Sequence, residues 1–201
     1  MMKKPVIVLG GGGHAKVLID ALRLSGVKVL GYTDRSKEAG HALGVPFLGG
    51  DERVLDFSPK KVLLVNGVGS VESTKKRRDL FRSFKDKGYQ FASVIHRSAV
   101  LAKTVKLGEG VQVMAGAVIQ TGTVIGDNAI INTKASVDHD CRIGVHVHIA
   151  PGVVLSGGVK IGFGSHIGVG AIIVQNVVVG NRSFVKAASL VTRTYRSANT
   201  R

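Results

Sequence analysis

The sequence contains one cysteine and no long apolar run, and each of these absences excludes a class of protein. A single cysteine, Cys141, in 201 residues excludes an internal disulfide and indicates a reducing, cytoplasmic environment. No apolar run approaches the roughly 20 residues needed to cross a bilayer, so we expect no membrane insertion. The apolar start at 5–9 is short and runs into four glycines, which predicts a first strand rather than a signal peptide.

Acidic residues are also scarce, with 13 aspartates and glutamates against 28 lysines and arginines and a net charge of +15. Such an excess can indicate nucleic-acid binding. However, the basic residues are spread along the chain, tryptophan is absent, and the densest run, at 75–78, lies on a predicted helix beside Asp79. We therefore interpret the excess as a solvated basic surface, expect no nucleic-acid partner, and note that it favours polyanionic small ligands.

The second half of the chain has an unbroken period of six. Every sixth residue between positions 101 and 191 is aliphatic: Leu101, Leu107, Val113, Ile119, Ile125, Ile131, Val137, Ile143, Ile149, Leu155, Ile161, Ile167, Ile173, Val179, Val185 and Val191. A fixed hexapeptide period predicts a β-helix, in which short strands and corners stack coil on coil. A glycine often follows the aliphatic residue, and we expect it to supply backbone angles that tight corners need: Gly108, Gly126, Gly144, Gly162, Gly168 and Gly180.

The first half alternates strand-like and helix-like segments. Strands are predicted at 5–9, 27–32, 45–48, 61–65 and 91–95, and helices at 14–24 and 73–87. This alternation predicts a small Rossmann-like α/β domain with a parallel sheet. We therefore divide the chain into an α/β domain at 1–94 and a β-helix at 95–201.

A glycine-rich turn joins the first strand to the first helix. Gly10, Gly12 and Ala15 can be laid on the dinucleotide fingerprint, with Asp34 about twenty residues further on. Glycines allow backbone N–H groups to approach a diphosphate at a helix N-terminus. About 95 residues are too few for a two-halved dinucleotide domain, so a nucleotide-sized ligand fits better than NAD. A purely structural turn stays open as an alternative.

The β-helix pattern carries one conspicuously polar segment, at 132–141. It includes His139 between two aspartates, which is the chemistry of a general base: a carboxylate orients the imidazole and raises its basicity. A metal site built from His139, His146 and His148 is an alternative, although their spacing matches no common zinc pattern and we expect no metal. Histidines that only line corners are a second alternative, and Cys141 fits a small buried side chain better than a nucleophile.

These motifs together resemble a family of bacterial sugar acyltransferases that join a nucleotide-binding α/β domain to a left-handed β-helix. The matching stretches are VIVLGGGGHAKV at 6–17, GYTD at 31–34, NGVGS at 66–70, INTKASVDHDCRIG at 131–144 and HIAPG at 148–152. The family includes N-acetyltransferases of nucleotide-linked amino sugars and sialic acid O-acetyltransferases. The left-handedness is implied by this resemblance and not by the period.

The resemblance also implies roles for individual residues. His139 is the implied general base, Asp140 the neighbour that raises its pKa, and Asn132 a residue near the acceptor sugar. His148 is implied to contact the acetyl end of acetyl-CoA. Two further sets complete the implied site: Gly157, Val169 and Ala187 for the CoA arm, and Gly12, Gly13, His14, Asp34, Arg35 and Gly67 for the nucleotide sugar, with Gly69 as a competitor for Gly67.

The expected activity is direct transfer of an acetyl group from acetyl-CoA to the amine of a nucleotide-linked 4-amino-4,6-dideoxy sugar, for surface glycan synthesis. Sugar O-acetylation and a non-catalytic nucleotide-binding trimer are the alternatives. A homotrimer is expected because a lone prism exposes apolar faces and the family shares sites between subunits. The family's G-x-P-A-[KR] segment is missing from the polar stretch at 194–201, which predicts weaker contacts to the adenine end of CoA.

Overall fold

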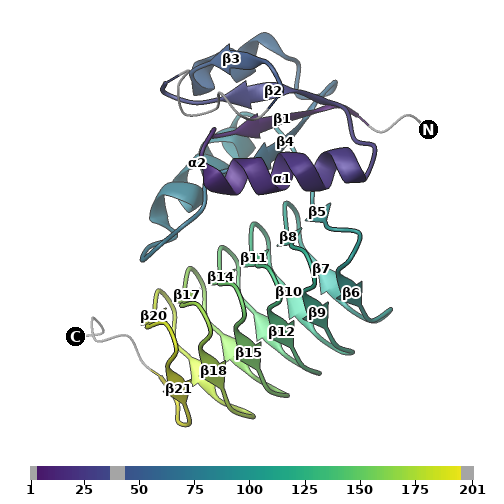
Figure 1. Ribbon diagram of the computed structural model, residues 1–201. Coiled ribbons are helices and arrows are strands. Elements are labelled where there is room, and N and C mark those ends of the chain that lie inside the picture. The colour runs from purple at the N-terminus through teal and green to yellow at the C-terminus, as the bar shows by residue number, and fades with distance from the viewer. Residues whose placement is uncertain (1–3, 37–43, 196–201) are drawn as a thin grey trace.

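The computed structural model describes residues 4–36 and 44–195, which form an α/β domain placed along one side of a β-helix (Figure 1). The coils of the β-helix run in one direction, from β6 near the domain junction to β21 near the C-terminal end (Figure 1). The predicted fold, a small Rossmann-like domain followed by a left-handed parallel β-helix, is confirmed.

The N-terminal domain contains a four-stranded parallel sheet in the order β3-β2-β1-β4. Its central strand β1 is buried along its whole length, as expected for a parallel sheet covered on both faces. Helix α1 packs against Val6 and Val8, while α2 and η2 pack against Ile7 and Leu9 on the other face. The elements are β1 (Val6–Leu9), α1 (Gly13–Leu24), β2 (Val29–Thr33), β3 (Phe47–Gly49), the 3-10 helix η2 (Asp51–Asp56), β4 (Leu63–Asn66) and α2 (Lys75–Asp86).

Most of the predicted elements are found, with ends displaced by one or two residues. The exception is the strand predicted at 91–95, which is reduced to an isolated bridge at Phe91 and a two-residue strand, β5 (Val94–Ile95). Because β5 pairs with β8 of the β-helix, the predicted domain boundary between residues 94 and 95 falls inside it. The helix η2 was not predicted.

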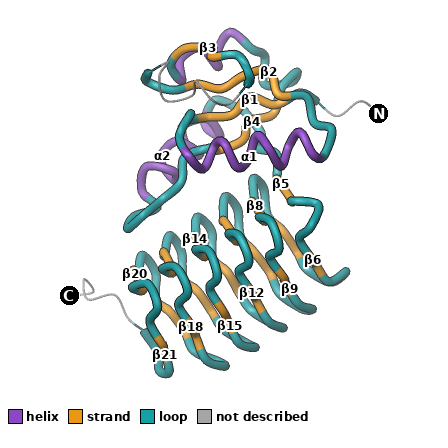
Figure 2. The backbone as a smooth tube through the Cα atoms, viewed as in Figure 1, coloured by secondary structure: helices purple, strands orange, loops and turns teal. Residues whose placement is uncertain are grey.

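The β-helix completes one coil every 18 residues, so each hexapeptide supplies one strand and one corner. Val124, for example, pairs in parallel with Arg142 and Arg142 with Lys160. Figure 2 shows the short strands alternating with longer turns. We call the three resulting sheets the covered, the apolar and the basic sheet, after their outer faces. The covered sheet consists of β5, β8 (Gln112–Val113), β11 (Ile130–Ile131), β14 (His148–Ile149), β17 (His166–Ile167) and β20 (Phe184–Val185).

The other two sheets are built in the same way. The apolar sheet consists of β6 (Val100–Leu101), β9 (Val118–Ile119), β12 (Ser136–Val137), β15 (Val154–Leu155), β18 (Ile172–Ile173) and β21 (Leu190–Val191). The basic sheet consists of β7 (Lys106–Leu107), β10 (Val124–Ile125), β13 (Arg142–Ile143), β16 (Lys160–Ile161) and β19 (Val178–Val179).

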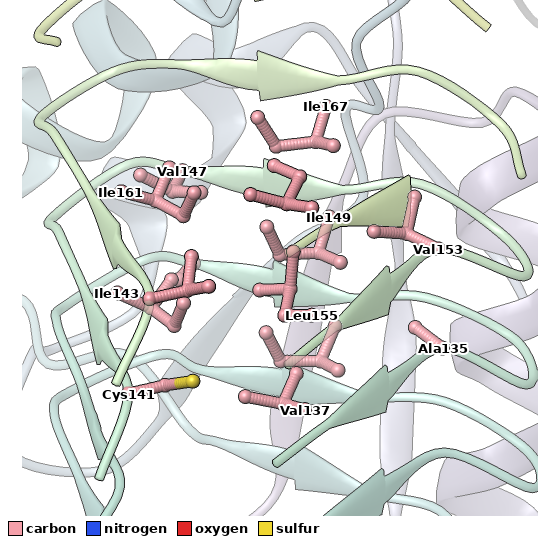
Figure 3. Packing of buried hydrophobic residues seen from close by; sticks show 14 of the residues in the cluster. Ala135, Val137, Cys141, Ile143, Val147, Ile149, Val153, Leu155, Ile161 and Ile167 are labelled. Atoms are coloured by element: carbon pink, nitrogen blue, oxygen red, sulfur yellow. The ribbon is translucent and has the colours of Figure 1, made fainter. Parts of the chain in front are cut away.

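The sixfold aliphatic residues are the second residues of these strands, and their side chains fill the interior of the prism. Figure 3 shows Val137, Ile143, Ile149 and Leu155 stacked in this core, with Cys141 among them. Cys141 is fully buried, and burial raises the pKa of its thiol. Its environment is that of a small core residue, which agrees with the sequence-based interpretation.

The corners correct our explanation of the glycines. Residues in the left-handed backbone region recur every six positions, but at a different phase: Gly110, Gly116, Gly122, Asn128, Lys134, Asp140, His146, Gly152, Gly158, Gly164, Gly170, Asn176, Arg182 and Ala188. The glycines that follow the aliphatic residues are needed for space instead. A Cβ at Gly126 would lie 2.7 Å from the backbone nitrogen of Val145 in the next coil, and one at Gly162 would lie 2.6 Å from that of Asn181.

The outer faces of the three sheets differ in polarity. The covered sheet lies against the N-terminal domain, and its Gln112, Ile130 and His148 are buried. The apolar sheet presents aliphatic side chains to solvent at five of its six outward positions: Val100, Val118, Val154, Ile172 and Leu190. The basic sheet presents Lys106, Arg142 and Lys160. Among the described residues, no helix is long and apolar enough to cross a membrane.

Candidate functional site

The residues predicted for acetyl transfer lie on two different edges of the β-helix. His139, Asp140 and Gly157 belong to corners that lead from the apolar sheet to the basic sheet. Asn132, Val169 and Ala187 belong to corners that lead from the covered sheet to the apolar sheet, and His148 lies on strand β14 beside them. One chain therefore brings each set together but keeps the two sets apart, with the apolar sheet between them.

On the first edge, His139 and Asp140 form a hydrogen-bonded pair. The distance from His139 Nδ1 to Asp140 Oδ2 is 2.8 Å, and the His139 side chain is 49% exposed. The hydrogen bond to Asp140 raises the pKa of His139. With Nδ1 held by the carboxylate, Nε2 is left to exchange a proton with a ligand, as a general base requires.

Gly157 gives this imidazole its space. A Cβ atom at Gly157 would lie 2.5 Å from His139 Nε2. Its backbone does not adopt the left-handed conformation, so the need for glycine here comes from the histidine. The contact is between neighbouring coils, since Gly158 donates its backbone N–H to the carbonyl of His139 over 2.9 Å.

On the second edge, a cavity of about 380 Å³ contains Asn132, His148, Val169 and Ala187, four of the predicted residues. His148 is 5% exposed. Its Nε2 lies 3.1 Å from Asn132 Nδ2, and its Nδ1 lies 2.7 Å from the hydroxyl of Ser70, a residue of the N-terminal domain. Burial and the neighbouring His166 hold the pKa of His148 well below its usual range, so this imidazole is neutral at pH 7.

Ser70 and His166 line this cavity as well, and neither was predicted as a site residue from the sequence. His166 was detectable, because it follows His148 by one 18-residue coil and pairs with it directly. Its ring stacks edge-on against His148 with centroids 4.8 Å apart, and burial lowers its pKa. Ser70 stood within a matching motif, but no periodic signal connects it to His148.

The glycine turn borders a separate cavity of about 700 Å³. Gly10, Asp34 and Arg35 line it from one side, and Lys75 and Lys76 of α2 from the other. Asp34 also holds the turn, since the Gly11 N–H donates to its carboxylate over 2.7 Å. Gly12 and Gly13 do not line this cavity, but they are exposed, with nothing within 4 Å of an added Cβ, so the start of α1 is open to a ligand. Basic side chains and open backbone N–H groups suit phosphate groups.

The other two residues predicted for the nucleotide sugar make contacts within the protein. His14 Nε2 lies 2.7 Å from Gln112 Oε1 across the domain junction, and desolvation lowers its pKa to about 4. Gly67 packs tightly, because a Cβ there would lie 2.7 Å from the carbonyl oxygen of Leu9. At Gly69 an added Cβ would lie 3.3 Å from His14 Cβ. Their contacts with a ligand stay predictions.

Arg77 is buried, which corrects our interpretation of the whole basic run at 75–78 as solvated surface. Its side chain is 1% exposed and lies between the domains. Nη1 donates to the carbonyls of Asn66 (2.7 Å) and Val68 (3.0 Å), and Nε donates to that of Asn128 (3.3 Å). Desolvation lowers its pKa to about 9. The sequence offered one signal, because Arg77 shares a helix face with the buried Phe81 and Phe84.

The three histidines of the alternative metal site, His139, His146 and His148, do not form one cluster. His139 lies on an exposed edge, whereas His146 is buried between Phe81 and Phe163 and hydrogen-bonds to Asn128. Within residues 4–36 and 44–195, no group of three or more histidine, cysteine or acidic side chains could hold a metal ion. The expectation about the polar end at 194–201 lies largely outside the described residues, which stop at Tyr195.

Comparisons with known proteins agree with this architecture. Residues 5–84 match the model of the PglD N-terminal domain, and residues 104–135 match that of the bacterial transferase hexapeptide. No match is found among the curated proteins. The structure of PerB from Caulobacter crescentus, in complex with CoA and GDP-perosamine, is 39% identical, with a TM-score of 0.90 over 96% of this chain and 91% of that one.

Two further structures extend the comparison. The acetyltransferase domain of PglB from Neisseria gonorrhoeae, in complex with acetyl-CoA, is 32% identical, with a TM-score of 0.90 over 96% of this chain and 93% of that one. WeeI from Acinetobacter baumannii shares the fold at 21% identity, with a TM-score of 0.87 over 98% and 95% of the two chains. The predicted resemblance is therefore confirmed: this chain belongs to the sugar N-acetyltransferases that combine a PglD-type N-terminal domain with a left-handed β-helix of hexapeptide repeats.

Proposed function

We propose that the protein transfers the acetyl group of acetyl-CoA to the amine of a nucleotide-linked 4-amino-4,6-dideoxy sugar, in the cytoplasm, for surface glycan synthesis. The observation that carries the proposal is the exposed His139–Asp140 pair, a histidine whose basicity is raised beside an open edge. PerB, at 39% identity, was crystallised with CoA and GDP-perosamine, which supports both substrate classes.

In the proposed reaction, the sugar amine attacks the thioester carbonyl and forms a C–N bond. His139 Nε2 accepts the proton that the amine loses, while Asp140 stabilises the imidazolium through Nδ1. The tetrahedral intermediate then collapses with cleavage of the C–S bond, and the proton passes to the departing CoA sulfur. The neutral His148 lies where the acetyl end of acetyl-CoA is expected to bind, and Asn132, expected near the acceptor sugar, lines the same cavity.

This chemistry requires two subunits, because His139 and the cavity of His148 lie on opposite borders of the apolar sheet. We propose a homotrimer in which the three apolar sheets face a common axis, so that the first edge of one subunit meets the second edge of its neighbour. Val100, Val154, Ile172 and Leu190 are 59%, 41%, 45% and 65% exposed in one chain. A row of exposed aliphatic side chains of this kind marks a protein interface.

The nucleotide is proposed to bind in the cavity between the glycine turn and α2. Arg35, Lys75 and Lys76 offer positive charge to a diphosphate, and Asp34 offers a carboxylate to hydroxyl groups. We propose that domain 1–94 binds the nucleotide and that domain 95–201 binds acetyl-CoA.

The test is acetyl transfer to matched acceptors. The protein is incubated with acetyl-CoA and either GDP-perosamine or free sialic acid, and mass spectrometry is combined with an assay for released thiol. We expect one acetyl group on the amine of the nucleotide-linked sugar. Acetylation of sialic acid alone would favour the O-acetyltransferase, and nucleotide binding without CoA binding in calorimetry would favour a non-catalytic trimer.

A further inference from the structure

The segment 67–74, which connects β4 to α2, borders two cavities at once. Val68 and Ser73 line the cavity of about 700 Å³ proposed for the nucleotide. Ser70, Val71 and Glu72 line the cavity of about 380 Å³ proposed for the acetyl donor. The N-terminal domain therefore contributes three residues, including the hydroxyl of Ser70, to a cavity whose other lining residues belong to the β-helix.

The hydrogen bonds around Ser70 have a defined direction. The backbone N–H of Thr133 donates to Asn132 Oδ1 over 2.8 Å, so the amide nitrogen of Asn132 is the atom that faces His148 and donates to its Nε2 over 3.1 Å. Since Nε2 accepts, the proton of neutral His148 is on Nδ1 and is donated to Ser70 Oγ over 2.7 Å. The Ser70 hydroxyl also lies within hydrogen-bond distance of Nδ1 of His166, 3.2 Å away.

The segment that carries Ser70 is held at both ends. The buried Arg77 binds the carbonyls of Asn66 and Val68 at its start. At its other end, the Thr74 hydroxyl donates to the carbonyl of Gly164 in the β-helix over 2.9 Å. Ser70 is thus presented at a fixed position to two imidazoles of the covered sheet, which reduces the entropy cost of the hydrogen bonds.

We propose that Ser70 is a positioning residue for acetyl transfer: it accepts the Nδ1–H hydrogen bond of His148 and so holds this imidazole against the Asn132 amide in the acetyl-donor cavity. Among the described residues, one amide hydrogen of Asn132 is used by His148, and the second remains available to an oxygen atom of a bound ligand. This inference rests on the proposed function for its consequence, but its structural part can be measured without any substrate.

The experiment compares Ser70→Ala with Ser70→Thr, which keeps the hydroxyl. The control is Ser58→Ala, whose hydroxyl contacts only the backbone of Lys60 among the described residues. Long-range ¹H–¹⁵N spectra of the histidine side chains report the tautomer. We expect wild type, Ser70→Thr and Ser58→Ala to show the same ¹⁵N shifts of His148, protonated at Nδ1, and Ser70→Ala to show a shifted Nδ1 resonance, because its N–H has lost the acceptor.

Kinetics then measure the consequence. Losing a hydrogen bond of this kind is expected to raise the KM for acetyl-CoA about three- to tenfold in Ser70→Ala, with the KM for the nucleotide sugar unchanged. Wild-type ¹⁵N shifts of His148 in Ser70→Ala would overturn the proposal. So would an equal rise of both KM values with a lower melting temperature, which indicates a merely structural role. If the wild-type protein acetylates no amino sugar, the proposed function fails, while the tautomer assignment is still decided by the spectra.

Discussion

His139 and His148 belong to two edges of the same β-helix, and their surroundings have opposite effects on the imidazole. His139 is 49% exposed at its side chain and bound to a carboxylate, which raises its pKa. His148 is 5% exposed, lies under the N-terminal domain near Arg77 and His166, and has a pKa held well below its usual range. One imidazole can therefore gain a proton during a reaction, whereas the other is a fixed hydrogen-bonding group.

The difference follows from which face of the prism the N-terminal domain covers. It lies on the covered sheet, which includes β14 (Figure 1), and the edge with His139 is left exposed. The same division places an exposed aliphatic sheet between the two edges. A single chain thus holds two half-sites in which the pKa of the histidine is shifted in opposite directions.

The largest effect is expected from His139→Ala. Loss of the general base should lower kcat by about 10²–10⁴, with little change in the KM for acetyl-CoA. Steady-state kinetics with His96→Ala as the control measure this effect. Turnover close to that of the wild type would show that the exposed histidine is not the base.

Ile172→Glu tests whether the half-sites meet across subunits. A carboxylate on β18, the strand next to the last in the apolar sheet, should dissociate the trimer, because burying an unpaired charge costs several kcal/mol by order of magnitude. The mass measured by light scattering should fall to that of a monomer, and the activity should fall at least about tenfold. The matched control is Val178→Glu on the basic sheet, where Val178 is 39% exposed and the assembly should persist. A monomeric variant with full activity would contradict a shared site.

Gly157→Ala tests the position of the imidazole without removing it. The added Cβ would lie 2.5 Å from His139 Nε2, so the ring must move. A displacement of this size is expected to lower kcat roughly 10- to 100-fold. The melting temperature should change little, because the Gly157 backbone is accessible to alanine. A crystal structure that shows an unmoved His139, together with normal kcat, would refute this explanation of the glycine.

Asp140→Asn tests the origin of the basicity of His139. Asparagine tolerates the left-handed backbone found at this position, where φ is 60°. Without the carboxylate, the pKa of His139 should fall, so the acid limb of the kcat/KM profile should move to lower pH and the plateau should drop. An unchanged acid limb would assign it to another group.

The buried His146 should affect stability rather than rate. The pKa of His146 is lowered from 6.5 to about 4 by desolvation and by arginines of α2. The unfolded chain therefore binds more protons than the folded one between these values, and stability present above about pH 6.5 is lost as the pH falls towards 4. In urea unfolding, the free energy of unfolding should fall by roughly 1–2 kcal/mol between about pH 7 and 5 because of this group. The variant His146→Asn should lack this part of the pH dependence. Equal pH dependence in the variant would argue against it.

The sequence predicted features that depend on neighbouring residues or on the coil period. The aliphatic residues appear in the core as expected, and His139 contacts Asp140, its neighbour in sequence. Ser70 and Arg77 were missed because their partners are remote: Ser70 and His148 are 78 positions apart. The glycines were misinterpreted, since sequence does not separate a glycine required by φ from one required by the next coil.

The sequence by itself determined the period of the β-helix, the inward direction of its aliphatic side chains and the pairing of His139 with Asp140, because all three follow from local geometry repeated every six residues. Only the tertiary structure decided which sheet the N-terminal domain covers. That choice makes His148 neutral, buries Arg77 and leaves the apolar sheet exposed. Burial and low dielectric are properties of packed elements, and a periodic pattern does not specify which of three equivalent faces another domain will cover.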